Sequence, residues 1–155
     1  MLRISKMTDY GTVVMTQLAQ NPQRRYSARE LAEEVHIGVP TVSKILKILE
    51  RGGLLDAQRG KNGGYTLARE PQGITVAQVI RAMEGPIALT ECASEDLQCD
   101  QEDSCTVQTN WQRLNKAIMR ALEEVSLAEM NTPISVEGVQ SHTLEFYREP
   151  KKAAL

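Results

Sequence analysis

Residues 27–53 constrain the fold most, because their pattern predicts two short helices joined by a tight turn. The sequence S-A-R-E from Ser27 has the form of a capping box, in which the serine and glutamate side chains bond free N–H groups at a helix start. Gly38 is expected to form the turn, since glycine adopts positive φ at little steric cost. Pro40 suits the first turn of the second helix, and Gly52 suits its end. This order predicts a helix–turn–helix.

The second of these helices, of about eleven residues, has two chemically different faces. Four apolar residues at helical spacing form the side expected to be buried, namely Val42, Ile45, Leu46 and Leu49. The opposite side carries groups that can donate to phosphates or base edges, namely Thr41, Ser43, Lys44, Lys47 and Arg51. A helix–turn–helix places such a helix in the major groove of DNA. By itself, the pattern also fits an ordinary helical hairpin with a solvated basic face.

A basic, glycine-rich hairpin is predicted directly after the second helix. Strands over about 54–58 and 65–69 flank the sequence R-G-K-N-G-G, in which Asn-Gly is a strong hairpin-turn dipeptide. Arg59 and Lys61 make the tip positive, and arginine suits a narrow, electronegative minor groove. A hairpin of this kind after a helix–turn–helix is a wing. Residues 1–85 are therefore predicted to form a winged helix-turn-helix DNA-binding domain, mostly α with a small β-hairpin.

Two further amphipathic helices are expected in this domain. One covers about residues 8–20, and its apolar face contains Met7, Tyr10, Val14 and Leu18. The other follows a second capping-box sequence at Thr75, and Gly85-Pro86 ends it. Its expected buried side contains Val76, Val79, Ile80 and Met83.

Residues 86–106 are expected to form a cysteine-rich loop. All three cysteines lie in it, with the spacing C-x6-C-x5-C, at Cys92, Cys99 and Cys105. Thiolates are soft ligands that select zinc, copper(I) or iron–sulfur clusters. The loop lacks the C-x2-C pair typical of a structural zinc site, and its irregular spacing suits a bulkier cluster. Three cysteines leave one position of a four-ligand cluster for another residue, another chain or a small molecule. The spacing also permits free thiols or a thiol–disulfide switch.

A long amphipathic helix is predicted over residues 107–130. Its apolar face runs over four turns and contains Trp111, Leu114, Ile118, Ala121, Leu122 and Val125. One small chain has little left to bury this face against, so a second copy is the simplest partner and the helix is expected to form a homodimer. The alternative is that it folds back on its own domain. Residues 131–155 are expected to be a flexible tail.

The charge distribution favours a polyanion as partner of the N-terminal half. Residues 1–69 hold 11 basic and 6 acidic residues, whereas residues 70–155 hold 7 and 14, within a net charge of -2. No run is long and apolar enough for a membrane helix, and the N-terminus lacks the apolar segment of a secretory signal, so a cytoplasmic location is expected. We find no P-loop, dinucleotide fingerprint or nucleophile–base pair, and do not expect an enzyme.

Over about residues 1–130 the chain resembles the winged-helix regulators of the IscR, NsrR and RirA type. The matching segments include ISKMTDYG, VPTVSKILKILERGGLL, RGKNGGYTL and ITVAQVIRAMEGP, followed by the cysteine loop and a tryptophan-bearing helix. Within the family, LTEC, NWQRLNKAI and VSLAEM look most similar to the SUF-system regulator of iron–sulfur cluster assembly. The resemblance implies a homodimer that binds a palindrome-like DNA operator and represses cluster-assembly genes. It also implies an iron–sulfur cluster held by Cys92, Cys99 and Cys105.

Two departures from the IscR pattern bear on the fourth ligand. The first cysteine gap is one residue longer, and the position of the IscR histidine that ligates a 2Fe–2S cluster is Gln108 here. In nitric-oxide-sensing relatives an aspartate from the first helix of the partner chain takes this role, and Asp9 falls on that position. The resemblance therefore implies Asp9 as the fourth ligand and favours a 4Fe–4S over a 2Fe–2S cluster. The alternatives are a winged-helix regulator with a zinc or thiol-redox switch, and an iron–sulfur carrier that does not bind DNA.

Overall fold

The structure is a computed structural model, and it describes residues 4–60, 63–90, 93 and 105–132. The predicted Lys61, Cys92, Cys99 and most of the tail lie outside these residues. The described chain forms α1 (Lys6–Gln20), α2 (Ala28–Glu34), α3 (Val39–Arg51), β1 (Leu55–Gln58), β2 (Gly64–Leu67), the 3-10 helix η1 (Pro71–Gly73), α4 (Val76–Glu84), α5 (Gln108–Glu123) and α6 (Leu127–Met130). None of its helices is long and apolar enough to cross a membrane.

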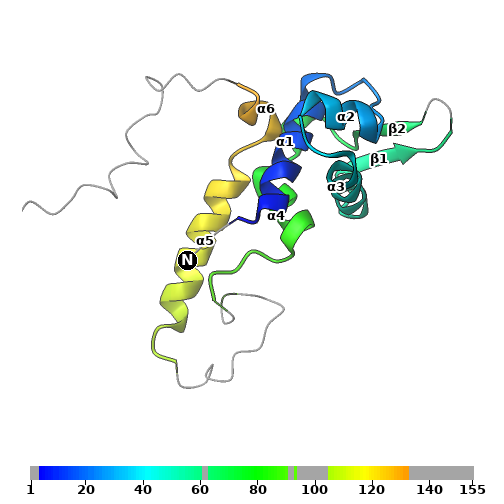
Figure 1. Cartoon of the computed structure of the whole chain (residues 1–155). Coiled ribbons are helices and arrows are strands. Elements are labelled where there is room, and N and C mark those ends of the chain that lie inside the picture. The colour runs from blue at the N-terminus through cyan, green and yellow to red at the C-terminus, as the bar shows by residue number, and fades with distance from the viewer. Residues whose placement is uncertain (1–3, 61–62, 91–92, 94–104, 133–155) are drawn as a thin grey trace, which may run out of the picture.

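Helices α1, α2, α3 and α4 pack around one apolar core, and the β1–β2 hairpin projects from its edge (Figure 1). All four apolar residues expected on the inner face of α3 are fully buried. In α4, Val79 and Ile80 are buried as expected, together with Ala77, whereas Val76 and Met83 are half-buried. The mostly helical fold with a small antiparallel hairpin is confirmed.

The turn between α2 and α3 differs from the prediction. Positive φ is adopted by His36, at 54°, whereas Gly38 has a φ of -57° and caps the start of α3. The backbone N–H of Ile37 donates to the carbonyl of Ala32 over 3.1 Å, which is the hydrogen bond of a Schellman motif. This motif requires the left-handed conformation directly after the helix C-cap, and that position is His36. The expectation for Gly38 was therefore wrong.

The hairpin is held to the domain by a third extended segment. Leu55 pairs with Leu67 and Gln58 with Gly64 in an antiparallel register. The backbones of Tyr26 and Tyr65 exchange hydrogen bonds of 3.0 and 2.8 Å, and Tyr26 is fully buried. A Cβ on Gly64 would lie 2.5 Å from the carbonyl oxygen of Tyr26, so only glycine permits this approach. The hairpin is therefore anchored to the segment between α1 and α2, and its first strand also contacts α3.

Helix α5 begins away from the winged domain and runs back toward it, and α6 then packs on the core (Figure 1). The backbone N–H of Leu127 donates to the carbonyl of Ile74 over 2.9 Å, and the Leu127 side chain is fully buried in the core. The Asn131 side chain donates to the Thr16 carbonyl at 3.1 Å. The C-terminal end of α5 is thus joined to the winged domain through α6, and α5 also contacts α4.

Candidate nucleic-acid interface

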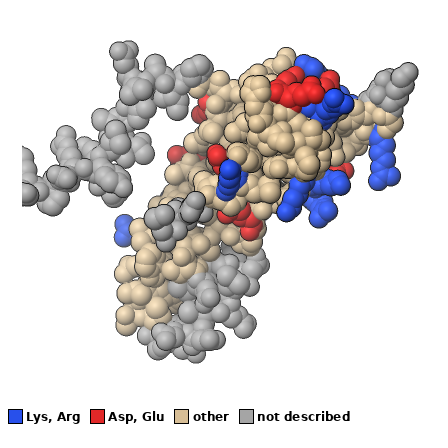
Figure 2. Space-filling model, in the orientation of Figure 1, with Lys and Arg blue, Asp and Glu red and all other residues tan. Residues whose placement is uncertain are grey.

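The outer face of α3 is basic and lies open to solvent. Lys44, Lys47 and Arg51 are exposed, and Thr41 and Ser43 are half-buried beside them. This orientation follows from the packing, because the four apolar residues of α3 face the core. In the described part of the chain, none of the three basic side chains takes part in an ion pair. Figure 2 shows the resulting blue surface at the side of the molecule where α3 lies.

The acidic residues of α2 do not neutralise this face, because they pair with arginines elsewhere. Arg24 lies 3.6 Å from Glu30 and 3.5 Å from Glu34, and Arg29 lies 3.2 Å from Glu33. Red and blue atoms accordingly lie together over the α2 region in Figure 2, whereas blue dominates below α3. Such exposed pairs contribute little to stability, but they engage all three carboxylates of α2 away from α3.

The hairpin extends the same basic surface. Arg59 follows β1 directly and is exposed, while Lys61 at the tip lies outside the described residues. The structure thus brings Arg59 to the end of a hairpin that is anchored beside α3. A convex basic helix next to a projecting basic hairpin can contact the major groove and the adjacent backbone of a DNA duplex at once.

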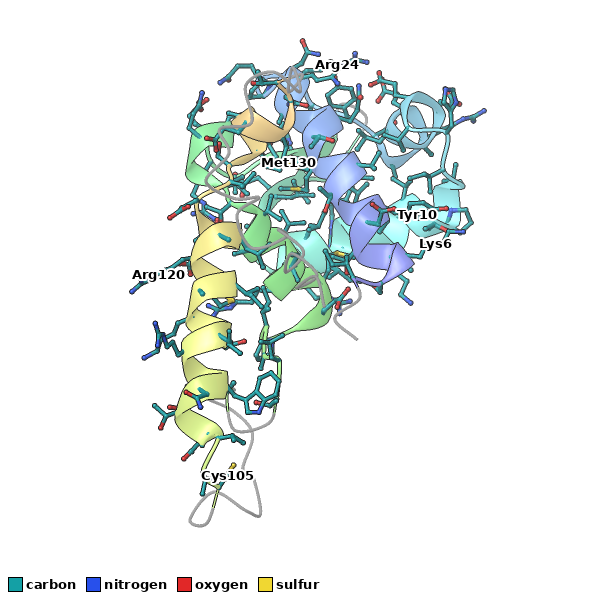
Figure 3. The ribbon with its side chains drawn as sticks, turned by 90° about the vertical axis from the view of Figure 1, so that its left-hand side faces the viewer. Lys6, Tyr10, Arg24, Cys105, Arg120 and Met130 are labelled. Carbon is teal, nitrogen blue, oxygen red and sulfur yellow. The ribbon has the colours of Figure 1, made fainter. Side chains whose placement is uncertain are left out.

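The predicted metal ligands are only partly described. Cys105 is half-buried just before α5 and forms no disulfide among the described residues, which also contain no cluster of three metal-ligating side chains. Asp9 is exposed in the first turn of α1. In Figure 3, Cys105 lies at the far end of α5, away from Lys6 and Tyr10 at the start of α1. One chain therefore does not bring Cys105 and Asp9 together.

Asn115 is a functional candidate that the sequence analysis missed. It is the buried residue of α5, and its side chain holds the segment that leads into the cysteine loop. Its Oδ1 accepts from the Leu89 N–H at 3.1 Å, and its Nδ2 donates to the carbonyls of Ile87 and Ala93 at 3.4 and 3.3 Å. The sequence did contain a signal for Asn115, because it is a polar residue within the apolar stripe of the helix predicted over residues 107–130.

A second polar contact connects α4 to the start of α1. The Glu84 carboxylate accepts a hydrogen bond of 2.5 Å from the hydroxyl of the fully buried Thr8, and one of 2.8 Å from the Ser5 backbone N–H. These hydrogen bonds, the Thr8 one first, lower the pKa of Glu84 below its ordinary value. Ionised Glu84 thus joins the end of α4, where the cysteine loop begins, to the helix that carries Asp9.

The helix–turn–helix, the anchored hairpin and the unpaired basic face define a winged-helix protein of the DNA-binding class. The Rrf2 family, described as iron-dependent transcriptional regulators, matches residues 4–133, and the chain belongs to this family of transcription regulators rather than to an enzyme family.

Relatives of known sequence or structure support this assignment over most of the chain. The Rrf2 protein of Nitratidesulfovibrio vulgaris is 28% identical over 83% of this chain and 87% of its own. The structure of CymR, the global cysteine regulator of B. subtilis, is 29% identical with a TM-score of 0.67, over 84% of this chain and 97% of that one. The structure of T. potens IscR is 31% identical with a TM-score of 0.63, and the match covers 83% of this chain and 85% of that one.

Proposed function

We propose that the protein is a cytoplasmic, dimeric repressor that binds a DNA operator and senses an iron–sulfur cluster. The proposal of DNA binding rests on the basic face of α3. Its lysine and arginine side chains form no ion pair with an acidic residue in the described structure. Unpaired cations on a helix that faces solvent attract the phosphate backbone and release its counterions. The cluster part rests on the cysteine spacing and on the family.

The DNA contacts divide by chemistry. Lys44, Lys47 and Arg51 would contact phosphates and position the protein, while Thr41 and Ser43 would reach base edges in the major groove. On the hairpin, Arg59 and Lys61 would enter the minor groove.

A second copy of the chain is the proposed occupant of the apolar face of α5. Trp111 and Leu114 on this face remain 39% and 51% exposed, which is unfavourable for such large apolar side chains in an isolated chain. The dimer would present two copies of α3 to half-sites about 34 Å apart, or a multiple of that distance.

The proposed cluster ligands are Cys92, Cys99 and Cys105 of one chain and Asp9 of the partner subunit, with a 4Fe–4S cluster favoured over 2Fe–2S. The Asp9 carboxylate makes no hydrogen bond or ion pair within the described residues, and the Cys105 thiol is outside any disulfide there. Their separation within one chain supports an aspartate supplied by the partner subunit (Figure 3).

The cluster would act as the ligand of an allosteric switch. Couplings of about 1–3 kcal/mol between two sites change affinity about 5–150-fold. The loaded protein is proposed to repress the genes of SUF-type iron–sulfur assembly, so that a sufficient supply of clusters reduces their synthesis.

The test is anaerobic purification with a visible spectrum and iron and sulfide analysis, followed by binding to a duplex selected from a randomised pool. We expect brown protein whose DNA affinity changes when the cluster is removed. If the protein stays colourless after reconstitution but binds DNA, the cysteines serve zinc binding or thiol chemistry instead of a cluster. Brown protein that passes its cluster to an acceptor and does not bind DNA would be a carrier.

Asp9 is tested by Asp9→Ala, with Glu33→Ala on α2 as a matched change of an exposed carboxylate. Asp9→Ala should alter the visible absorption or shorten the lifetime of the cluster, and Glu33→Ala should not. An unchanged spectrum and lifetime in Asp9→Ala would exclude Asp9 as a ligand.

A further inference from the structure

A second basic feature lies between α3 and α4, outside the helix–turn–helix face. It is a groove of about 580 Å³ into which three arginines project, Arg51, Arg69 and Arg81. Ile48, Leu54 and Gln78 are among the other described residues that line it, and none of these described lining residues is acidic. All three arginines are exposed and therefore accessible to a ligand.

The fold places these arginines from three different segments at one site. Arg51 is the last residue of α3, Arg81 belongs to α4, and Arg69 follows β2. The end of α3 approaches α4 so closely that a Cβ on Gly52 would lie 2.7 Å from the Cβ of Ala82. This approach brings Arg51 and Arg81 to the two sides of the groove.

The charges of the groove have no counter-charge in the described structure. Arg69 has a neutral partner, because its Nη2 donates to Gln78 Oε1 at 3.4 Å. None of the three arginines forms an ion pair within the described residues, and Glu84, on the same helix as Arg81, is bonded to α1. Arg51 and Arg81 also lie in the last turns of their helices, where the helix dipole favours cations. The helix dipole does not explain the position of Arg69, because this residue lies outside the helices.

The groove is continuous with the basic face of α3. Ile48 lines the groove and lies one turn after Lys44 and one turn before Gly52 on the same side of the helix. Arg51 belongs to both surfaces. An oxyanion in the groove would therefore lie beside the DNA that α3 contacts.

We propose that Arg69 and Arg81, together with Arg51, bind a backbone phosphate of DNA that flanks the base pairs read by α3. Planar guanidinium groups suit this role, because they bind phosphate oxygens in a bidentate manner. This inference rests on the proposed DNA-binding function. It adds a phosphate contact from outside the helix–turn–helix and the hairpin.

The test is the salt dependence of binding to a mixed-sequence DNA duplex, measured with the full chain and with Arg81→Gln and Arg69→Gln. Each phosphate contact contributes about 0.9 to the slope of log affinity against log salt concentration. Loss of one contact should lower the slope by about 0.9 and weaken binding about eightfold at 0.1 M salt, if the affinity extrapolated to 1 M is unchanged. Arg81→Lys should recover part of the loss, because it keeps the charge without the bidentate geometry.

Arg113→Gln on α5 is the matched control, since it removes an exposed arginine from a helix that does not line the groove. Thermal unfolding of every variant checks that the fold is retained, and Arg81→Gln is the cleaner variant because Arg69 also contacts Gln78. The inference is overturned if Arg81→Gln and Arg113→Gln have the same slope as the unmodified protein. The inference is also overturned by a second result, in which Arg81→Gln leaves the DNA slope unchanged but removes a stabilisation by inorganic phosphate. In that case phosphate, at constant ionic strength, raises the melting temperature of the unmodified protein and not that of Arg81→Gln. The groove would then be a site for a small anion.

Lys47→Gln separates this inference from the proposed function. If Lys47→Gln lowers the slope and the two groove variants do not, DNA binding by α3 stands and the groove assignment fails. If the unmodified protein does not bind the duplex, the proposed function fails as well.

Discussion

Replacement of Asn115 by alanine should detach the chain segment that leads into the cysteine loop. The Asn115 side chain is 8% exposed and makes three hydrogen bonds to the backbone of residues 87–93, with lengths of 3.1, 3.3 and 3.4 Å. An alanine at this position would leave the Leu89 N–H and the two carbonyls without these bonds, in a partly buried location.

The expected loss follows from the number and quality of these bonds. A typical intramolecular hydrogen bond contributes a net of about 0.5–1.5 kcal/mol to stability. Two of the three bonds are long, and half-buried backbone groups can partly bond to water instead. Alanine also has the higher helix propensity, by up to about 0.7 kcal/mol. We therefore expect Asn115→Ala to reduce the free energy of unfolding by about 1–2 kcal/mol.

The assay combines urea unfolding with amide hydrogen exchange at Leu89, at one protomer concentration for all variants. Asn110→Ala is the matched control, because Asn110 is an exposed asparagine on the same helix. Asn115→Ala should lower the unfolding midpoint and the protection of the Leu89 amide, while Asn110→Ala should do neither. Equal midpoints for the two variants, or unchanged protection at Leu89, would refute the reasoning.

Three further predictions concern packing, pH and assembly. Gly52→Ala should cost about 1–3 kcal/mol of unfolding free energy, because its new methyl group overlaps Ala82. Ala82→Gly in the same chain should recover part of this loss in urea unfolding, and strictly additive losses would contradict the contact. The hydrogen bonds from α1 lower the pKa of Glu84, so its ionised form stabilises the fold above the ordinary pKa of 4.5, and this contribution is lost as pH falls through the lower folded value. The advantage of the unmodified protein over Glu84→Gln should accordingly shrink below about pH 4.5 in urea titrations, and a constant difference would show that the charge does not matter. Leu114→Glu, next to Trp111 on the exposed face of α5, should shift the protein to monomers in analytical ultracentrifugation, and an unchanged mass would exclude this face from the dimer contact.

The local signals in the sequence predicted the individual elements well. The capping boxes at Ser27 and Thr75 form with both reciprocal hydrogen bonds, and the structure adds a third capping box at Ser126. Such signals involve residues three apart, so the sequence contains all of their partners. The same holds for the periodicity that identified the buried face of α3. The first helix begins at Lys6 rather than at residue 8, and α3 has 13 residues rather than about eleven.

The contacts between distant segments had no such signal. Leu127 belongs to the core, although the whole of α5 separates it in sequence from the rest of the winged domain. The bridge between Tyr26 and Tyr65 is a backbone pairing, which side-chain patterns do not encode. The groove at Arg51, Arg69 and Arg81 was missed for the same reason, since its three arginines are far apart in sequence. The ligand set of the cysteine loop stays a prediction, because two of its cysteines lie outside the described residues.

Helix α4 connects the two proposed sites, and this gives the switch a physical route. It carries Arg81 in the groove beside α3, and Glu84 at its end is bonded to the first turn of α1. The next residue, Gly85, begins the segment that Asn115 holds near the cysteine loop. Arg81 lies three residues before Glu84 on this nine-residue helix. If a cluster orders the cysteine loop and displaces α4, the separation of Arg81 and Arg51 changes, and with it the proposed phosphate contact.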